Sequence, residues 1–493
     1  MSGGVNLLDA HASIEIPLWG KGSILLTGRR SYTDFIESSL YNNIYDMLSN
    51  GDGEDTQSPT PGSGFAGGRQ GGMGGGGFGS FQQPQTTSTR PTFYFYDLNG
   101  KITYRPTEKD NLSISFYSGK DNLFEDSENT REIEGRTIRN NTIPGRIIFN
   151  SRDEDTDWGN QGISFKWSRQ WNPKFYSNFM GAYSHYFSNY YQAIQNETFN
   201  IESDTLMNSR NRGSLEDNDV NEFTLRLDNE WQISNRHHLG FGLNLSQTNI
   251  TYNFIRDDTL SILNRDETGL LATLYAQDLW KITSKIEINI GLRSSYYDIT
   301  GNMYLGPRLS FRYKPTSYLT VKGATGKYNQ FVNRVINENV TEGSRDFWLL
   351  ADNELVEVQS SWHYIFGGSI ENEMLLFDVE AYYKTLKGLS EYSLRYRRNN
   401  IELNQLFFAG EGNSKGIEFL LQKKQGEFTG WLSYTLAKVE HQFEGLNEGS
   451  SFPALHDQTH EFKTVANWEP HRKWRFSATW VYGSGKPYTA PES

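Results

Sequence analysis

The chain has 493 residues, only 36% of them hydrophobic and 14% aromatic, and carries a formal net charge of −12 at pH 7. A soluble chain so poor in aliphatic residues would bury too little surface to offset its chain entropy, whereas a barrel whose apolar face meets lipid needs no second apolar layer. The acidic balance argues against a nucleic-acid partner, and the absence of cysteine excludes disulfides and thiol chemistry.

The first residues predict strands and no membrane-spanning helix. The opening MSGGVNLLDAHASIEI shows neither the basic nor the apolar region of a signal peptide. No apolar run anywhere in the chain reaches the roughly 18 residues that a transmembrane helix needs. Residues 9–18 form the first complete predicted strand, and a short turn at 19–22 leads into the next one.

Residues 31–90 predict a long loop with a short helix and a flexible tract. Ser31 and Asp34 have the spacing of a capping box, and the aliphatic residues at 36, 40, 44 and 48 share one helical face. We therefore expect a helix over 34–48. Residues 52–90 are rich in glycine and carry almost no apolar surface, so we expect this tract to be disordered.

Beyond residue 90 the dominant pattern is alternation of apolar and polar residues, which is typical of β-strands. It is clear at 112–117, 223–228, 239–246, 377–382 and 475–480. We count roughly nineteen candidate strands of about ten residues or more, which matches the roughly 9–11 residues that a tilted strand needs to cross a bilayer.

The segment IEINIGLRSSYYD, residues 286–298, shows what the two faces of such a strand contact. Its aliphatic positions fall on one side, and we expect Ile286, Ile288, Ile290 and Leu292 to face lipid. Its polar positions fall on the other side. We expect Glu287, Asn289 and Arg293 to face a polar lumen.

The connections alternate between short and long, as in outer-membrane barrels with periplasmic turns and extracellular loops. Short turns are predicted at 19–22, 106–110, 172–174, 234–237, 283–285, 315–318, 425–427 and 469–473. Long polar segments are predicted at 31–90, 120–157, 190–218, 254–268, 330–358, 388–412 and 440–456. Six of the twelve tryptophans, at 19, 171, 231, 280, 468 and 474, lie at or beside a short turn, as expected for an interfacial aromatic girdle.

Motifs that suggest other chemistry fail on context, and we predict no catalytic, cofactor-binding or metal-binding residues. The GxGxxG match at 62–67 has no strand before it and no helix after it, and YGSGKPYT lacks the first glycine of a P-loop. His456 and His460 fall at a predicted strand entry, where residues four apart are about 13 Å apart, too far to share one zinc ion. The acidic stretches GDGED and LEDNDVNE lack the spacing of an EF-hand.

Five segments in order resemble the TonB-dependent outer-membrane receptors, in the form common in Bacteroidetes. GSILLTGRRSYTDFI resembles the third barrel strand and its loop. LYAQDLWKITSKIEINIGLRSSYYD resembles a mid-barrel hairpin, and LGPRLSFRYKPTSYLTVKGATGKYNQF the next one. NSKGIEFLLQKKQGEFTGWLSYTLAK and FPALHDQTHEFKTVANWEPHRKWRFSATWVYGSGKPYT resemble later hairpins. The resemblance covers nearly the whole chain.

The resemblance implies an all-β transmembrane barrel of the 22-stranded type that imports a bound nutrient, powered by TonB through an N-terminal plug. Residues 2–8 resemble the tail of the first strand, which leaves residues 1–493 as a partial barrel without plug or TonB box. Strand 9–18 then counts as strand two and 474–489 as strand nineteen. We expect three further strands, on the order of 70–100 residues, to follow in the intact gene.

The implied partners are outer-membrane lipid, the TonB complex and a nutrient ligand such as a siderophore, glycan, peptide or cofactor, with a surface lipoprotein as an option. Arg29, Arg226 and Arg293 are expected in the lumen, where contact with the plug is favoured over contact with an anionic ligand. Tyr190 and Tyr191 would either stack on a ligand or belong to the girdle, and the girdle is favoured. The alternatives are a passive porin and a secreted soluble all-β binding module, and an outer-membrane enzyme ranks last.

Overall fold

The computed structural model describes residues 1–34, 36, 85–88, 91–138, 141–257, 260–339, 343–392 and 407–487. The helix predicted over 34–48 falls outside these residues, apart from residues 34 and 36. Most of the predicted flexible tract also falls outside them. Within that tract the structure describes only Gln85–Ser88, which form the short strand β4.

The described chain forms one large antiparallel sheet of 21 strands and two separate hairpins. Two strands of the sheet are short additions, β4 and β23 (Phe452–Pro453). Without these two, the described sheet has nineteen strands (21 − 2), the number that the sequence predicts. No helix among the described residues is long and apolar enough to cross a membrane.

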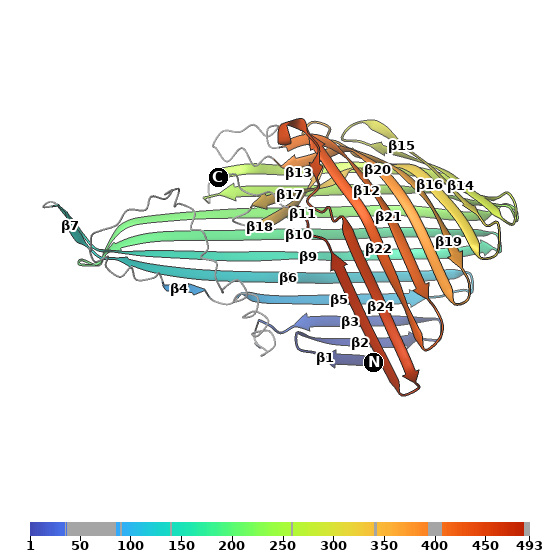
Figure 1. Ribbon diagram of the computed structural model, residues 1–493, viewed down its shortest axis with the longest axis horizontal. Coiled ribbons are helices and arrows are strands. Elements are labelled where there is room, and N and C mark those ends of the chain that lie inside the picture. The colour runs from blue at the N-terminus through green and yellow to red at the C-terminus, as the bar shows by residue number, and fades with distance from the viewer. Residues whose placement is uncertain are drawn as a thin grey trace, which may run out of the picture.

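Apart from β4 and β23, consecutive strands of the sheet pair with one another in chain order, and the sheet wraps round so that β19–β24 cross in front of β6–β13 in Figure 1. These strands are β1 (Ser2–Val5), β2 (Asp9–Leu18), β3 (Gly22–Ser31), β5 (Thr92–Tyr104), β6 (Asp110–Ile133), β9 (Arg146–Asn172), β10 (Phe175–Asn200), β11 (Thr205–Gln232), β12 (His237–Arg256), β13 (Leu260–Lys281), β14 (Ile286–Tyr297), β15 (Asn302–Tyr313), β16 (Leu319–Gln330), β19 (Gln359–Glu371), β20 (Leu375–Tyr392), β21 (Phe407–Lys423), β22 (Phe428–Phe443), β24 (His460–His471) and β25 (Trp474–Gly483). The separate hairpins are β7 (Arg136–Ile138) with β8 (Asn141–Ile143), and β17 (Val332–Asn339) with β18 (Gly343–Leu350). A single 3₁₀ turn, η2 (Asn447–Gly449), follows β22.

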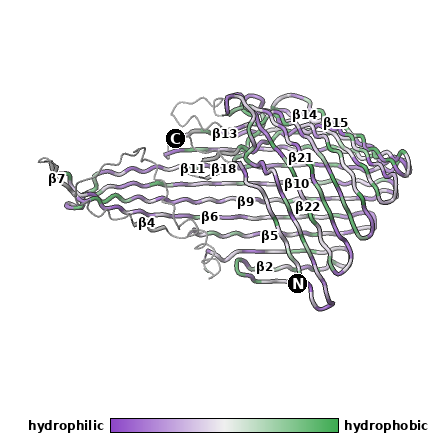
Figure 2. The backbone as a smooth tube through the Cα atoms, viewed as in Figure 1, coloured by the Kyte–Doolittle hydropathy of each residue, from purple (hydrophilic) through white to green (hydrophobic). Residues whose placement is uncertain are grey.

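The two faces of the sheet differ as the alternation predicts. On β14, Ile290 is 53% exposed and Leu292 is 49% exposed, whereas Tyr297, on the opposite face, is 2% exposed. Cross-strand register joins the exposed positions into a continuous apolar belt, because Leu292 lies beside Ala276 on β13 and Pro307 on β15. Figure 2 shows apolar positions alternating with polar ones along these strands. The belt is the surface that contacts lipid.

The predicted tryptophan girdle is exposed at the short-turn edge of the sheet. The exposed fractions range from 39% for Trp280 to 88% for Trp19. The other four members, Trp171, Trp231, Trp468 and Trp474, lie between these values. Amphipathic rings at one edge of an apolar belt mark the boundary between bilayer and water.

The predicted short turns are all present, and on the same edge of the sheet the sequence missed one more, at 372–374. There the Asn372 side chain accepts hydrogen bonds from the backbone N–H groups of Met374 and Leu375, at 2.9 and 2.8 Å. The turn between β2 and β3 places Trp19 and Gly20 at φ angles of 45° and 68°. Positive φ at two successive residues gives the twist that suits a tight hairpin, and glycine adopts it without strain.

The prediction that 120–157 and 190–218 are loops is wrong for most of their length. These residues continue the strands, so that β6, β9, β10 and β11 reach 24, 27, 26 and 28 residues. Continuous antiparallel pairing satisfies the backbone N–H and C=O groups, so a polar segment stays extended outside the bilayer. The sequence pattern fails here because both faces of the sheet meet water, which removes the contrast between apolar and polar positions.

Candidate functional site

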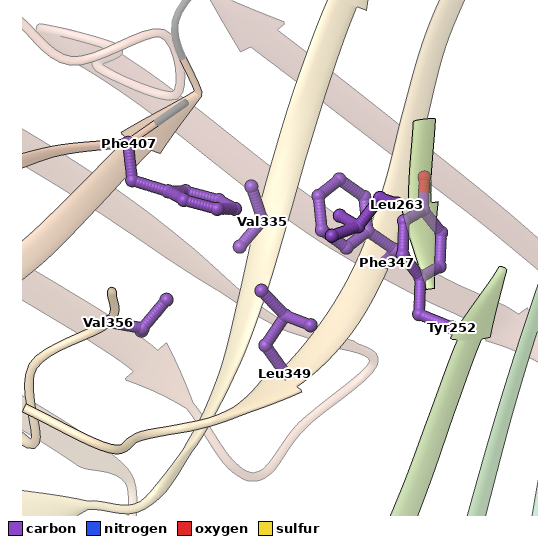
Figure 3. Close-up of a cluster of buried hydrophobic side chains, with 7 residues drawn as sticks. All are labelled: Tyr252, Leu263, Val335, Phe347, Leu349, Val356 and Phe407. Carbon is purple, nitrogen blue, oxygen red and sulfur yellow. The ribbon is translucent and has the colours of Figure 1, made fainter. Parts of the chain in front are cut away.

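The segment 331–358, described except at 340–342, leaves the barrel wall after β16, and its described residues fold into the mouth of the lumen. Its hairpin carries β17 and β18, of which β18 contacts the walls at β11, β12 and β13, and β17 contacts β20. Phe347 of β18 stacks on Tyr252 of β12, with ring centroids 4.3 Å apart. These two rings belong to a buried cluster shown in Figure 3, whose members are Tyr252, Leu263, Val335, Phe347, Leu349, Val356 and Phe407. We call this segment the mouth hairpin.

Polar contacts fix the mouth hairpin against β11. Asn218, 2% exposed on β11, accepts a hydrogen bond from the Trp348 backbone N–H at 2.8 Å. Its side-chain amide also donates to the Trp348 carbonyl at 3.4 Å. One side chain therefore pairs with both backbone groups of Trp348, as a neighbouring strand would.

An ion pair and an aromatic contact hold the two ends of the hairpin. Asp352 forms an ion pair with Arg265 of β13 at 3.1 Å, and its carboxylate accepts hydrogen bonds from the backbone N–H groups of residues 354–356. Burial alone would raise the pKa of the Asp352 carboxyl, but these donors hold it below its usual range. Phe331 lies with its ring centroid 4.9 Å from that of Tyr297 on β14. The hairpin is thus a fixed part of the lumen mouth.

Three arginines converge on the lumen wall deeper in the barrel. Arg226 of β11, Arg293 of β14 and Arg308 of β15 line a cavity of about 230 Å³ together with Tyr275 and Gln277. Arg293 shares a strand face with Tyr297 and lies four residues away, about 13 Å along the strand. The cavity is therefore below the mouth hairpin, at the depth of the lipid-facing belt.

This arginine cluster has more positive than negative charge. Asp228 pairs with Arg226 at 2.8 Å and accepts a hydrogen bond from the Tyr275 hydroxyl at 2.6 Å. The Arg308 guanidinium lies over the Tyr328 ring, 4.8 Å from its centroid. In the part of the chain that the structure describes, no carboxylate forms an ion pair with Arg293 or Arg308. The cluster is therefore suited to an anionic group from outside this chain.

Arg29 belongs to a different part of the wall and is neutralised there. It pairs with Asp97 at 2.7 Å and lies over the Phe95 ring, 4.6 Å from its centroid. Tyr117 also donates its hydroxyl to Asp97, at 3.0 Å. The structure therefore brings Arg226 and Arg293 together but not Arg29. The structure adds Arg308 to these two arginines. The sequence could have indicated this, because alternation along PRLSFRY places Arg308 on the polar face of its strand.

Tyr190 and Tyr191 lie on opposite faces of β10, outside the bilayer. Tyr190 donates a hydrogen bond to Glu154 at 3.0 Å, and Tyr191 is 45% exposed. They follow the first residue of β10, Phe175, by 15 and 16 positions. A membrane-crossing strand needs only about 9–11 residues. The favoured girdle interpretation of the two tyrosines therefore does not fit their position, and Tyr190 faces the vestibule above the lumen.

His456 and His460, near the C-terminal end of the sheet, contact different residues. His456 packs edge-on against His441, with ring centroids 5.8 Å apart, and His460 forms a hydrogen bond with Tyr434 at 2.9 Å. Within the described ranges, no group of three or more histidine, aspartate or glutamate residues is placed to hold a metal ion.

Acidification is expected to loosen the segment 444–457 that packs on β22. Burial, with the neighbouring His456, lowers the pKa of His441 to about 4. His441 follows Phe428 by 13 residues, beyond the membrane-spanning part of β22. A histidine with a lowered pKa stabilises the packed state while neutral, so stability should be complete above pH 6.5 and be lost as pH falls toward 4. Hydrogen exchange of 444–457 between pH 7 and 4.5 measures this, and His441→Gln should remove the pH dependence. Unchanged protection at pH 4.5 would contradict the prediction.

A wrapped antiparallel sheet with an apolar outer belt, an aromatic girdle and a polar lumen defines a transmembrane β-barrel of the outer-membrane type. Residues 95–492 match the family described as TonB dependent receptor-like, beta-barrel. The chain therefore belongs to the TonB-dependent receptor β-barrel family. A search of curated proteins found no match to the chain.

Solved structures of similar fold include siderophore receptors. The ferric-catecholate import receptor Fiu from E. coli K12 has 10% sequence identity and a TM-score of 0.57 over 97% of this chain and 70% of its own. A variant of the ferric enterobactin receptor PfeA from Pseudomonas aeruginosa has 12% identity and a TM-score of 0.55 over 96% of this chain. The chain spans only 64% of the length of that receptor. At such low identity the likeness shows the fold alone.

Proposed function

We propose that this chain is the barrel of an active outer-membrane transporter, which takes up a bound nutrient in a step energised by TonB through a plug domain. The nutrient class is a siderophore, glycan, peptide or cofactor. The observation that carries the proposal is the arginine cluster beneath a mouth narrowed by a fixed hairpin, with Arg293 and Arg308 in no ion pair among the described residues. Passive pores for anions also carry arginine in the lumen, so TonB dependence is what separates this proposal from a porin, the second candidate.

We assign the arginine cluster first to carboxylates of the plug and second to an anionic group of the nutrient. Arginine forms bidentate, charge-assisted hydrogen bonds with such groups. In a barrel lumen these bonds would orient a plug, or hold a ligand between the mouth hairpin and the plug. The resemblance of the hairpin motifs also supports a Bacteroidetes origin and a surface lipoprotein partner, which the flanking genes would test.

TonB dependence is the direct test of active uptake. A strain lacking the gene is compared with its parent for growth on a panel of ferric siderophores, glycans, peptides and vitamin cofactors. We expect one compound to require the gene, and we expect the same growth defect when TonB is deleted. Growth that requires the gene but persists without TonB would identify a passive channel instead.

Replacing Arg293 and Arg308 together by glutamine is expected to lower uptake of that compound by at least about 10- to 100-fold, because losing even one hydrogen bond to a charged group costs roughly 1.5–3 kcal/mol. Gln277→Ala, which alters the same cavity without changing its charge, is the matched control and should retain uptake. Increased sensitivity of the cells to vancomycin would indicate that the plug is displaced. Weaker ligand binding with unchanged vancomycin sensitivity would indicate that the arginines contact the ligand. Normal uptake by the double variant would contradict the assignment.

A further inference from the structure

The strand β11 extends beyond its neighbour and leaves an open edge outside the membrane. It pairs with β10 along its length, but with β12 only from Ser214, which lies opposite Arg256. In the part of the chain that the structure describes, Thr205–Gly213 therefore pairs on one side only, apart from one hydrogen bond between Gly213 and Asp257. These residues span about 30 Å at the usual rise per residue, and residues 205–212 are exposed. Figure 1 shows β11 continuing with β9 and β10 well beyond the barrel rim.

The free edge presents backbone groups that are ready to pair. The Gly213 carbonyl accepts the Asp257 N–H at 2.7 Å, so the backbone groups of Gly213 point toward the β12 side. In an antiparallel ladder, alternate residues point the same way. Asn211 and Ser209 therefore turn their N–H and C=O groups toward the open edge. Such a row of groups is a template for an added strand.

The charge of this edge selects its partner. Thr205–Gly213 carries Arg210 and Arg212 and no acidic residue, in a chain whose net charge is −12. A second copy of the same edge would bring arginines near arginines, and facing like charges destabilise strand pairing. An acidic strand would instead place its carboxylates beside Arg210 and Arg212. The edge is therefore suited to an acidic partner and unsuited to a second copy.

The opposite edge of the same extended sheet already has an added strand. There β4 pairs with β6, with Gln85 opposite Thr130 and Ser88 opposite Ser127. The sheet thus accepts a short strand on one side and leaves the other side open. We propose that the Thr205–Gly213 edge binds an extended acidic peptide of a partner protein at the cell surface by β-strand addition.

The test uses the full-length receptor in lipid nanodiscs and two nine-residue probe peptides, one alternating glutamate with valine and one alternating lysine with valine. Fluorescence anisotropy at low salt should show the glutamate peptide binding at least tenfold more tightly. The double change Arg210→Glu and Arg212→Glu should reverse this preference. Equal binding of the two peptides, or binding of neither, would overturn the proposal.

A matched pair of variants tests the backbone contact. Asn211→Pro removes an N–H that faces the open edge, so it should weaken binding of the glutamate peptide at least fivefold. Asn211→Ala keeps that N–H and should bind the peptide normally. Heat-modifiable gel migration of both variants confirms that the barrel is folded. Equal binding by both variants would exclude strand addition. Binding that appears only after removal of residues 52–84 would show that the chain covers its own edge, and would also overturn the proposal.

Discussion

Replacing Leu292 by arginine is expected to destabilise the folded barrel in lipid by about 2–4 kcal/mol, the cost of a cation on the lipid face near the bilayer midplane. The register places this residue. Ile288 lies opposite the girdle residue Trp280, and Tyr296 marks the other aromatic end of the same face of β14. Leu292 is halfway between them. Ile288→Arg should cost less, because an arginine at the interface reaches water.

Unfolding titrations of the full-length barrel in vesicles measure this cost, with Asn289→Arg as the control. Asn289 alternates with Ile288 and Ile290 and faces the polar lumen, so its replacement should change the free energy of unfolding much less. Equal losses for Leu292→Arg and Asn289→Arg would mean that the two faces of β14 are assigned wrongly.

Phe347→Ala is expected to release the mouth hairpin from the wall. Phe347 is 3% exposed and stacks on Tyr252, and truncating a buried phenylalanine costs about 3–5 kcal/mol. The strand pairing of the wall does not depend on the hairpin, so this loss should appear as local opening rather than as unfolding of the barrel. Hydrogen exchange should show faster exchange of backbone amides in β17 and β18, with the amides of β12 unchanged.

The control for this prediction is Phe366→Ala on β19. Phe366 is 60% exposed on the lipid-facing side, so its truncation removes no contact with the hairpin. Liposome swelling provides a second measurement, because a detached hairpin should raise the passage of small sugars in Phe347→Ala alone. Equal exchange in β17 and β18 of the two variants would show that the aromatic stack does not hold the hairpin.

The sequence predicted the wall of this barrel well because the signals for it are local. Alternation with a period of two assigned Ile290 and Leu292 to one face and Arg293 to the other, and neither assignment depends on distant residues. The short turns were visible for the same reason, since each is specified by a few polar or glycine residues between two alternating segments. The turn missed on that edge, at 372–374, has no glycine or proline, and the side chain of Asn372 caps it.

The sequence did not predict the strand extensions or the mouth hairpin. In β6 and β9–β11 the alternation disappears where both faces meet water, although the backbone pairing continues. The mouth hairpin was predicted only as a long polar loop, because its inward fold depends on Asn218 and Tyr252, more than 90 positions before Trp348 and Phe347 in the chain.

By itself, the sequence determined the all-β architecture, the lipid and lumen faces and the edge that carries the girdle, since each follows from residues adjacent in the chain. Only the tertiary structure decided that Arg226, Arg293 and Arg308 form one cluster while Arg29 pairs elsewhere. The tertiary structure also decided that β11 extends beyond the end of β12. The physical reason is that alternation fixes which face a residue takes, whereas cross-strand register and the curvature of the sheet fix which residues of different strands become neighbours.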